Sequence, residues 1–399
     1  MAKRFTMFGW LLGLLVAVTA AVAVLGTAAP ASAATFPDWG SVSAGPDHVC
    51  GIRAGRLYCW GYNAHGELGD GTHTDRPVPR QITSATDWKS VSAGHSHSCA
   101  IRGTGKLYCW GDNSNGEVGR AAANYTVPLQ ITTATDWKSV AADYDTTCAI
   151  RSTGKLYCWG VDAGTGMDED PAAITWKPTQ VTTATDWKSL AVGDWSNCAI
   201  RVGKLYCWGY GPLGNNTYND SRYPVRITSA TDWSTVSVGM APTCALRVGK
   251  LYCWGVTPRQ VTTASDWRSL SIGGSGEDWD SGCAIRVGKL YCWGDVTWDD
   301  AESPEQQTSA TDWKSASTSG LYACAIRSTG RLYCWGYQLL DTDGNGWYDF
   351  DGDPREVWVA PSTSSSTAAA ATPEPTVPTA PHDLHRPGLR AADRVPAPR

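Results

Sequence analysis

The sequence predicts an all-β protein, a seven-bladed β-propeller of four-stranded antiparallel blades. Three observations predict it: an Asp-Trp pair that recurs seven times, a pair of cysteines in each repeat, and short alternating segments separated by Gly-containing turns. Successive Asp-Trp pairs are 49, 49, 50, 46, 34 and 46 residues apart. Periods of about 40–50 residues with several short strands are typical of propeller blades. The pairs begin at Asp38, Asp87, Asp136, Asp186, Asp232, Asp266 and Asp312.

Each repeat contains four candidate strands, which the second repeat illustrates. Trp88–Gly94 has the alternating pattern of a strand and ends in small residues, as expected of a crowded strand near the ring axis. Cys99–Arg102 and Lys106–Trp110 form a hairpin, and Pro128–Thr132 is a fourth, outer strand, where proline is tolerated. At the end of the last repeat, a strand near residues 355–359 could complete either the last blade or the first.

The fourteen cysteines sort into seven pairs, nine or ten residues apart within each pair. In the fourth repeat, a two-residue turn at Val202-Gly203 makes Arg201 face Lys204, which places Cys198 opposite Cys207. Opposed residues of a hairpin have Cβ atoms close enough for a disulfide. We therefore predict seven disulfides, one in each blade: Cys50 with Cys59, Cys99 with Cys109, Cys148 with Cys158, Cys198 with Cys207, Cys244 with Cys253, Cys283 with Cys292, and Cys324 with Cys334.

Two other interpretations of the cysteines remain. Zinc sites usually pair cysteines two residues apart, and the sequence has no Cys-x-x-Cys. Free thiols would suit a cytosolic protein, but the first 33 residues resemble an export signal. They combine Lys3 and Arg4, an apolar run over residues 8–25, and a small-residue site at Ala31-Ser32-Ala33. An uncleaved membrane anchor is the alternative for this segment.

The expected organisation is a signal peptide (1–33), a propeller (34–360) and a disordered tail rich in Pro, Ser, Thr and Ala (361–399). The mature protein is expected to be secreted or extracytoplasmic, monomeric and without a membrane span. Between the signal peptide and the tail, 27 basic and 35 acidic residues give a net charge of −8. Because nucleic-acid binding depends on neutralising phosphates, this balance argues against a nucleic-acid partner.

The repeats resemble the regulator of chromosome condensation repeat family. The resemblance rests on the segments 60–71, which reads Trp-Gly-Tyr-Asn-Ala-His-Gly-Glu-Leu-Gly-Asp-Gly, and 110–119, and it spans about residues 38–360. It implies a seven-bladed propeller, whereas the functions of such proteins range from nuclear exchange factors to secreted binders. Guanine-nucleotide exchange is not expected here, because an exported protein does not meet the GTPase.

Variation among the repeats indicates where function lies. The loops after the first and third strands share one face of the ring and differ in every blade, whereas the other face is nearly constant. Four tryptophans outside the repeat pattern, in or beside variable loops with acidic residues, are candidate contacts for a protein or glycan ligand: Trp176, Trp195, Trp279 and Trp298. Local covering of loops is the alternative.

One segment resembles the opening of a calcium-binding loop. Oxygen-bearing residues stand at its positions 1, 3, 5 and 9, with a carbonyl at position 7 and Gly at position 6, but position 12 is Gly352. No cofactor is required, and a structural Ca²⁺ is predicted here; the alternative is an acidic turn that stays metal-free. The candidate ligands are Asp341, Asp343, Asn345, Trp347, Asp349 and Asp353.

No catalytic residue is predicted, because the sequence contains neither a Gly-x-Ser-x-Gly elbow nor a phosphate loop. His95 and His97 could share a strand face, but loop hydrogen bonding is favoured over a metal site there. The expected function is therefore a non-enzymatic scaffold that binds a protein or a cell-envelope component through its variable face. The alternative is an exported hydrolase or lyase that uses acidic loop residues.

Overall fold

The computed structural model describes residues 38–121, 123–161, 174–239, 242–274, 280–297, 301–320, 322–337 and 350–357. The 28 strands within these ranges form seven antiparallel sheets of four, so the predicted propeller is confirmed. The chain divides into two units, Met1–Val359, which contains the propeller, and Ala360–Arg399, which lies outside the described residues.

The strands follow one another in chain order, four to a blade. Blades 1 and 2 comprise β1 (Trp39–Ala44), β2 (His48–Arg53), β3 (Arg56–Gly61), β4 (Arg76–Gln81), β5 (Trp88–Ala93), β6 (His97–Arg102), β7 (Leu107–Gly111) and β8 (Tyr125–Gln130). Blades 3 and 4 comprise β9 (Trp137–Asp143), β10 (Thr146–Arg151), β11 (Leu156–Gly160), β12 (Thr175–Gln180), β13 (Trp187–Val192), β14 (Ser196–Arg201), β15 (Lys204–Gly209) and β16 (Ser221–Arg226). Blades 5 and 6 comprise β17 (Trp233–Val238), β18 (Thr243–Arg247), β19 (Lys250–Trp254), β20 (Arg259–Gln260), β21 (Trp267–Gly274), β22 (Asp280–Arg286), β23 (Lys289–Gly294) and β24 (Ala301–Gln306). Blade 7 comprises β25 (Trp313–Thr318), β26 (Tyr322–Arg327), β27 (Leu332–Tyr337) and β28 (Phe350–Glu356).

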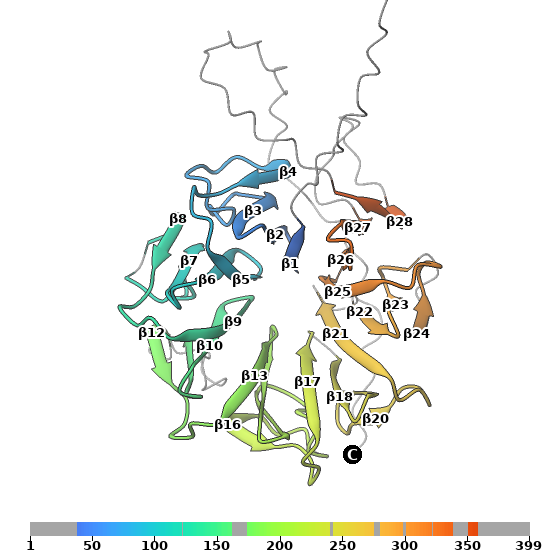
Figure 1. Cartoon of the computed structure of the whole chain (residues 1–399). Coiled ribbons are helices and arrows are strands. Elements are labelled where there is room, and N and C mark those ends of the chain that lie inside the picture. Colours follow the sequence, from blue (N-terminus) through green and yellow to red (C-terminus); the bar gives the residue numbers. More distant parts are fainter. Residues whose placement is uncertain are drawn as a thin grey trace, which may run out of the picture. The chain divides into compact units, whose positions relative to one another are not determined.

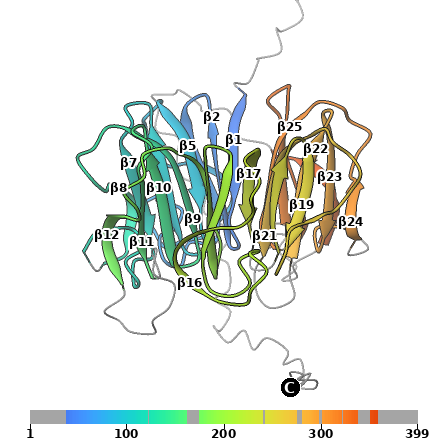
Figure 2. The ribbon, with the colours of Figure 1, turned by 90° about the horizontal axis from the view of Figure 1, so that it is seen from below.

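The first strand of each blade lies nearest the ring axis and the fourth lies on the rim (Figure 1). Seen across the axis, the strands run between the two faces of the ring (Figure 2). The fourth strand of blade 2 is longer than predicted, since it starts at Tyr125 rather than Pro128. It starts earlier because Gly111 at the end of β7 still pairs with Tyr125.

The hairpin register predicted from the cysteine spacing is confirmed. Arg201 pairs with Lys204, and Cys198 pairs with Cys207. The same opposition recurs in all seven hairpins, where each cysteine pair forms a disulfide with Cα atoms 4.1 Å apart. The other six disulfides join Cys50 and Cys59, Cys99 and Cys109, Cys148 and Cys158, Cys244 and Cys253, Cys283 and Cys292, and Cys324 and Cys334. Every cysteine of the chain is thereby used, so the predicted pairing is confirmed and the zinc and free-thiol interpretations are wrong.

Neighbouring blades are joined at the hairpin turns. The backbone N–H of Trp233 in blade 5, for example, donates to the carbonyl of Gly203 in blade 4, 2.9 Å away. Gly203 has a φ of +69°, and a Cβ there would lie 2.1 Å from the carbonyl oxygen of Thr231. Only glycine meets both demands, the left-handed backbone and the close approach.

The ring closes without exchange of strands between its ends. Strand β28 pairs with β27, so the strand near residue 355 completes the last blade. The N–H of Trp39 in blade 1 donates to the carbonyl of Gly330 in blade 7 at 2.9 Å, as at the other blade junctions. The Tyr322 hydroxyl in blade 7 also donates to the carbonyls of Gly45 and His48 in blade 1.

The core lies between the sheets and combines the repeated tryptophans with the repeated cysteines, leucines, isoleucines and alanines. Thirteen of the fourteen tryptophans in the repeat pattern are buried, as expected. The exception is Trp293, which is half-buried. Its junction differs from the others because the preceding blade has only the short segment Gly255–Pro258 where blades 1 and 2 have a long loop.

Candidate functional site

The two faces of the ring have different chemistry. We call the face with the hairpin turns and inter-blade links the hairpin face, and the opposite one the loop face. The loops after the first and third strands meet on the loop face, as predicted. In blade 2, for example, the N–H of Asp112 donates to the carbonyl of Ser96 at 2.8 Å.

The hairpin face repeats one set of contacts from blade to blade. In blade 2, Arg102 forms an ion pair of 2.6 Å with Asp87 and lies over the ring of Trp88, 5.8 Å from its centroid. Trp88 packs edge-on against Tyr108 and donates its indole N–H to Thr83. These contacts explain why Asp-Trp, Arg and Tyr recur in the sequence. They belong to the scaffold.

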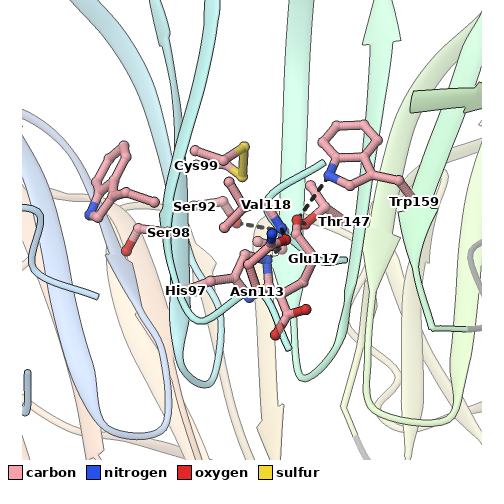
Figure 3. Close-up of a disulfide and its surroundings, with 12 residues drawn as sticks. Ser92, His97, Ser98, Cys99, Asn113, Glu117, Val118, Thr147 and Trp159 are labelled. Carbon is pink, nitrogen blue, oxygen red and sulfur yellow. Dashed lines mark hydrogen bonds between the residues drawn. A yellow bond between two sulfur atoms is a disulfide. The ribbon is translucent and has the colours of Figure 1, made fainter. Parts of the chain in front are cut away.

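On the loop face, the long loops of blades 1 and 2 connect neighbouring blades. Figure 3 shows this for the loop of blade 2, where the backbone carbonyl of Glu117 accepts the indole N–H of Trp159 and the hydroxyl of Thr147, each at 2.8 Å. The Asn113 side chain holds the loop from within by accepting the N–H of Val118. The Glu67 carbonyl in blade 1 accepts from Trp110 and Ser98 in the same way.

Two buried histidines take part in this network. The Thr147 hydroxyl donates to the Glu117 carbonyl, so the imidazole of His97 donates to Thr147 through Nε2 at 2.7 Å. His48 contacts Ser98 equivalently at 2.6 Å. Burial lowers the pKa of His97 to about 4 and that of His48 to about 3. Both are therefore neutral near pH 7 and serve in hydrogen bonding, as favoured from the sequence, although they open strands β2 and β6 rather than lie in loops.

Acidic and aromatic side chains gather on the loop face of blades 1 to 4. We call this the loop-face patch and define it by Asp47, His95, Asp112, Asp143, Tyr144, Asp145, Asp194 and Trp195. His95 lies at its centre, 3.5 Å from Asp47 and with its ring centroid 5.1 Å from that of Tyr144. Trp195 is 55% exposed and Tyr144 47% exposed. Trp195 rests edge-on against Tyr210, with 6.3 Å between the ring centroids.

Several carboxyl groups of the patch resist ionisation. Burial, together with the charge of Asp194, raises the pKa of Asp143 well above its usual range. Burial also raises the pKa of Asp194 to about 6; His95 opposes this shift and Asp145 adds to it. Beneath the patch, burial raises the pKa of Glu117 to about 7. Adding negative charge here costs free energy, so a cationic or hydrogen-bond-donating partner is favoured.

Comparison with protein-family models identifies the repeat. The Regulator of chromosome condensation (RCC1) repeat matches at residues 54–101, and a second model of the same repeat matches at residues 88–117 and 137–162. The chain carries RCC1 repeats over residues 54–117 and 137–162. The sequence has no significant match among the curated proteins.

Solved structures share the propeller fold of these RCC1 repeats. Prp20p from Saccharomyces cerevisiae is 18% identical with a TM-score of 0.63, and the match covers 82% of this chain and 88% of that chain. Yeast RCC1 (Prp20), in a structure with Kap60, is 18% identical with a TM-score of 0.64, and the match covers 82% of this chain and 86% of that chain. Human WBSCR16 is 16% identical with a TM-score of 0.50, and the match covers 81% of this chain and 82% of that chain.

The predicted site residues lie in different parts of the propeller, and several lie outside the described residues. Trp195 lies in the loop-face patch, and Trp176 lies in β12 on the rim, where it lines a groove. Trp279 and Trp298 lie outside the described residues, as does the calcium-like segment 341–349; Asp353 falls in β28, but its side chain is not described. Within the described ranges, no three His, Cys, Asp or Glu side chains are arranged so that they could hold a metal ion, and no helix could span a membrane.

Asp143 was not among the predicted site residues, although the sequence contains a signal for it. It follows the last small residue of the first strand in its repeat. Five other repeats have glycine at that position, as in Gly94 and Gly193. The seventh repeat has Ser319 there, so an acid at this crowded position marks blade 3 as different.

Proposed function

We propose that this chain is an exported scaffold that binds a protein partner through the loop face of its propeller. The observation that carries the proposal is the loop-face patch, where Trp195 and Tyr144 stand exposed among carboxylates. Aromatic side chains surrounded by polar groups are typical of binding hot spots. The disulfide-bonded strands beneath hold them in place, which lowers the entropic cost of binding.

Export is part of the proposal. Its support is the signal-like segment 1–33 together with seven disulfides, which persist in oxidising compartments. The mature chain would comprise the propeller to residue 360 and the tail 361–399. Intact mass spectrometry of the secreted protein tests this, because cleavage after Ala33 leaves Ala34 as the first residue.

The relatives with the same fold support a binding role. The Prp20p structure is described with its binding to Gsp1p and histones, and the yeast RCC1 structure contains Kap60. Those partners belong to those proteins. They illustrate that a propeller of RCC1 repeats can present a surface to other proteins.

The proposal is tested by replacing Trp195. The mature protein is used to capture partners from the secreted and surface fractions of its source, and the affinity of each purified partner is then measured by calorimetry. Trp195→Ala is expected to weaken binding at least tenfold with an unchanged thermal midpoint. Tyr223→Ala, which removes an aromatic ring that is 63% exposed on β16, is the matched control and should bind normally. Equal affinity of both variants and the parent protein would refute the role of the patch.

A second candidate is an exported hydrolase or lyase, and the favouring observation is the interaction between Asp143 and Asp194. Because burial, together with the charge of Asp194, raises the pKa of Asp143, one carboxyl can hold a proton while the other is ionised. Such a division suits a general acid and a general base. Turnover of any glycan or ester that is abolished in Asp194→Asn but retained in Trp195→Ala would favour the enzyme over the binder.

The calcium site remains a proposal for the segment 341–353. Titration of the metal-free protein with Ca²⁺ in a calorimeter is expected to show one site, and Asp341→Asn with Asp343→Asn should abolish it. Absence of heat in the parent protein would favour a metal-free turn.

A further inference from the structure

A groove of about 570 Å³ lies between blades 2 and 3, where the rim strands β8 and β12 are neighbours (Figure 1). Arg120 enters it from the loop after β7, and Tyr125 from β8. Trp176, Lys177 and Pro178 of β12 form the facing wall. Arg120 and Lys177 are exposed, so two cations flank an aromatic surface.

At the preceding junction, the residue equivalent to Arg120 forms ion pairs within the chain. Between blades 1 and 2, the equivalent of Arg120 is Asp70, since each follows a glycine that lies against the tryptophan of the next blade. Asp70 is 2.9 Å from Arg76 and 3.3 Å from Arg80, and its side chain is only 1% exposed. Burial opposes its ionisation, yet the Thr72 hydroxyl and Arg76 lower its pKa overall. This carboxylate is fully engaged.

The groove has lost that internal arrangement. Arg120 replaces Asp70, and Tyr125, which like Arg76 opens its strand opposite a glycine, removes one of the arginine partners. In β12, Trp176 and Lys177 stand where β8 has Thr126 and Val127. Among the residues that the structure describes, neither Arg120 nor Lys177 forms an ion pair. The described lining of the groove therefore presents cations without carboxylates, in a chain of net charge −5.

We propose that this groove binds an acidic segment of the protein partner, so the inference rests on the proposed function and specifies a second point of contact. Arg120 and Lys177 pair with carboxylates of the segment, and Trp176 contacts its apolar atoms. An arginine can hold a carboxylate through two parallel hydrogen bonds. Tryptophan, tyrosine and arginine are the residues most enriched in binding hot spots, which favours a polypeptide over a glycan.

The test uses a fluorescein-labelled octapeptide of alternating Glu and Tyr, titrated with the full propeller and followed by fluorescence anisotropy. The parent protein is expected to bind, and added salt should weaken binding. The double variant Arg120→Glu/Lys177→Glu should bind at least tenfold more weakly, and Trp176→Ala about threefold or more. The matched control Lys89→Glu/Lys188→Glu makes the same charge change at two exposed lysines of inner strands and should stay within twofold of the parent.

The inference would be overturned by no binding of the peptide, equal binding of its Gln-Tyr counterpart, an equal loss in the control variant, or tighter binding of trigalacturonate than of the peptide. Binding that appears only after Asp168, Glu169 and Asp170 are neutralised would do the same, because the cations would then have an internal partner. A captured partner that requires Trp195 but tolerates Arg120→Glu/Lys177→Glu would refute the groove and leave the proposed function intact.

Discussion

At the scale of single residues, the loop face contains carboxylates that lack the arginine partners found on the hairpin face. Arg102 neutralises Asp87, and Asp312 has Arg327 in the same position. Glu117, which is 1% exposed, instead accepts a backbone N–H from Asn115. Neutral backbone donors do not offset the loss of hydration, and the charges of Asp112 and Asp145 add to its effect, so the proton is retained to higher pH.

The raised pKa of Glu117 makes a prediction about stability and pH. The folded state takes up a proton more readily than the unfolded chain, whose carboxyl titrates near 4.5. The stabilising contribution is therefore fully present below pH 4.5 and is lost as the pH rises through about 7. Glu117→Gln, which keeps the acceptor, should raise the unfolding free energy at pH 8 by on the order of 1–2 kcal/mol. The gain should disappear near pH 4.5 in thermal unfolding.

The matched control for this prediction is Glu305→Gln, since Glu305 is exposed on β24 and pairs opposite Cys292. It should leave the pH dependence of the thermal midpoint unchanged. A destabilised Glu117→Gln protein at pH 8 would show that the ionised carboxylate is needed to hold the loop.

At the scale of the structural element, each hairpin turn serves both its own blade and the next. Gly203 and Gly211 separate the two demands on glycine, because both have positive φ values, +69° and +76°, but only Gly203 is crowded. Gly211→Ala is expected to cost about 1 kcal/mol, from the backbone conformation alone. Gly203→Ala should cost clearly more, because the new Cβ collides with the Thr231 carbonyl and the junction must open. Chemical denaturation measures the difference, and equal costs would contradict a steric role of this junction.

The repeated elements were predictable because each recurring position performs the same contact in every blade. The cysteine spacing determined the hairpin register, and the register determined the disulfides. The loop-face patch could not be predicted in this way. Asp47, His95, Asp145 and Asp194 are about 50 residues apart in the sequence and come together only because four blades place their first loops around one axis. The groove at Trp176 was equally hidden, since Arg120 faces it from another blade.

At the scale of the whole molecule, the ring has a junction between blades 7 and 1 that is not covalently continuous, yet it resembles the other six. Backbone bonds at the hairpin face recur there, and the N–H of Ala44 in β1 donates to the Ser317 hydroxyl in β25. The same contact joins Ala93 to Ser43 and Ala142 to Ser92. Closure therefore depends on a backbone bond that recurs at every junction and on a serine contact shared with four of the other six.

A circular permutant tests whether the position of the break matters. Val357 and Val181 are equivalent, because each donates its N–H to the leucine that begins the third strand of its blade. Four residues, 182–185, connect Val181 to Asp186, so a Thr-Thr-Ala-Thr linker should connect Val357 to Asp38 equally well. The first Thr also supplies a hydroxyl equivalent to the one that accepts the Trp187 indole N–H at 3.2 Å. New ends placed between Thr183 and Ala184 should give a protein with all seven disulfides and a thermal midpoint within a few degrees of the parent's. The control is a cyclic protein that has the same linker and no new ends. If it folds and the permutant does not, the fold requires the chain ends to lie between blades 7 and 1.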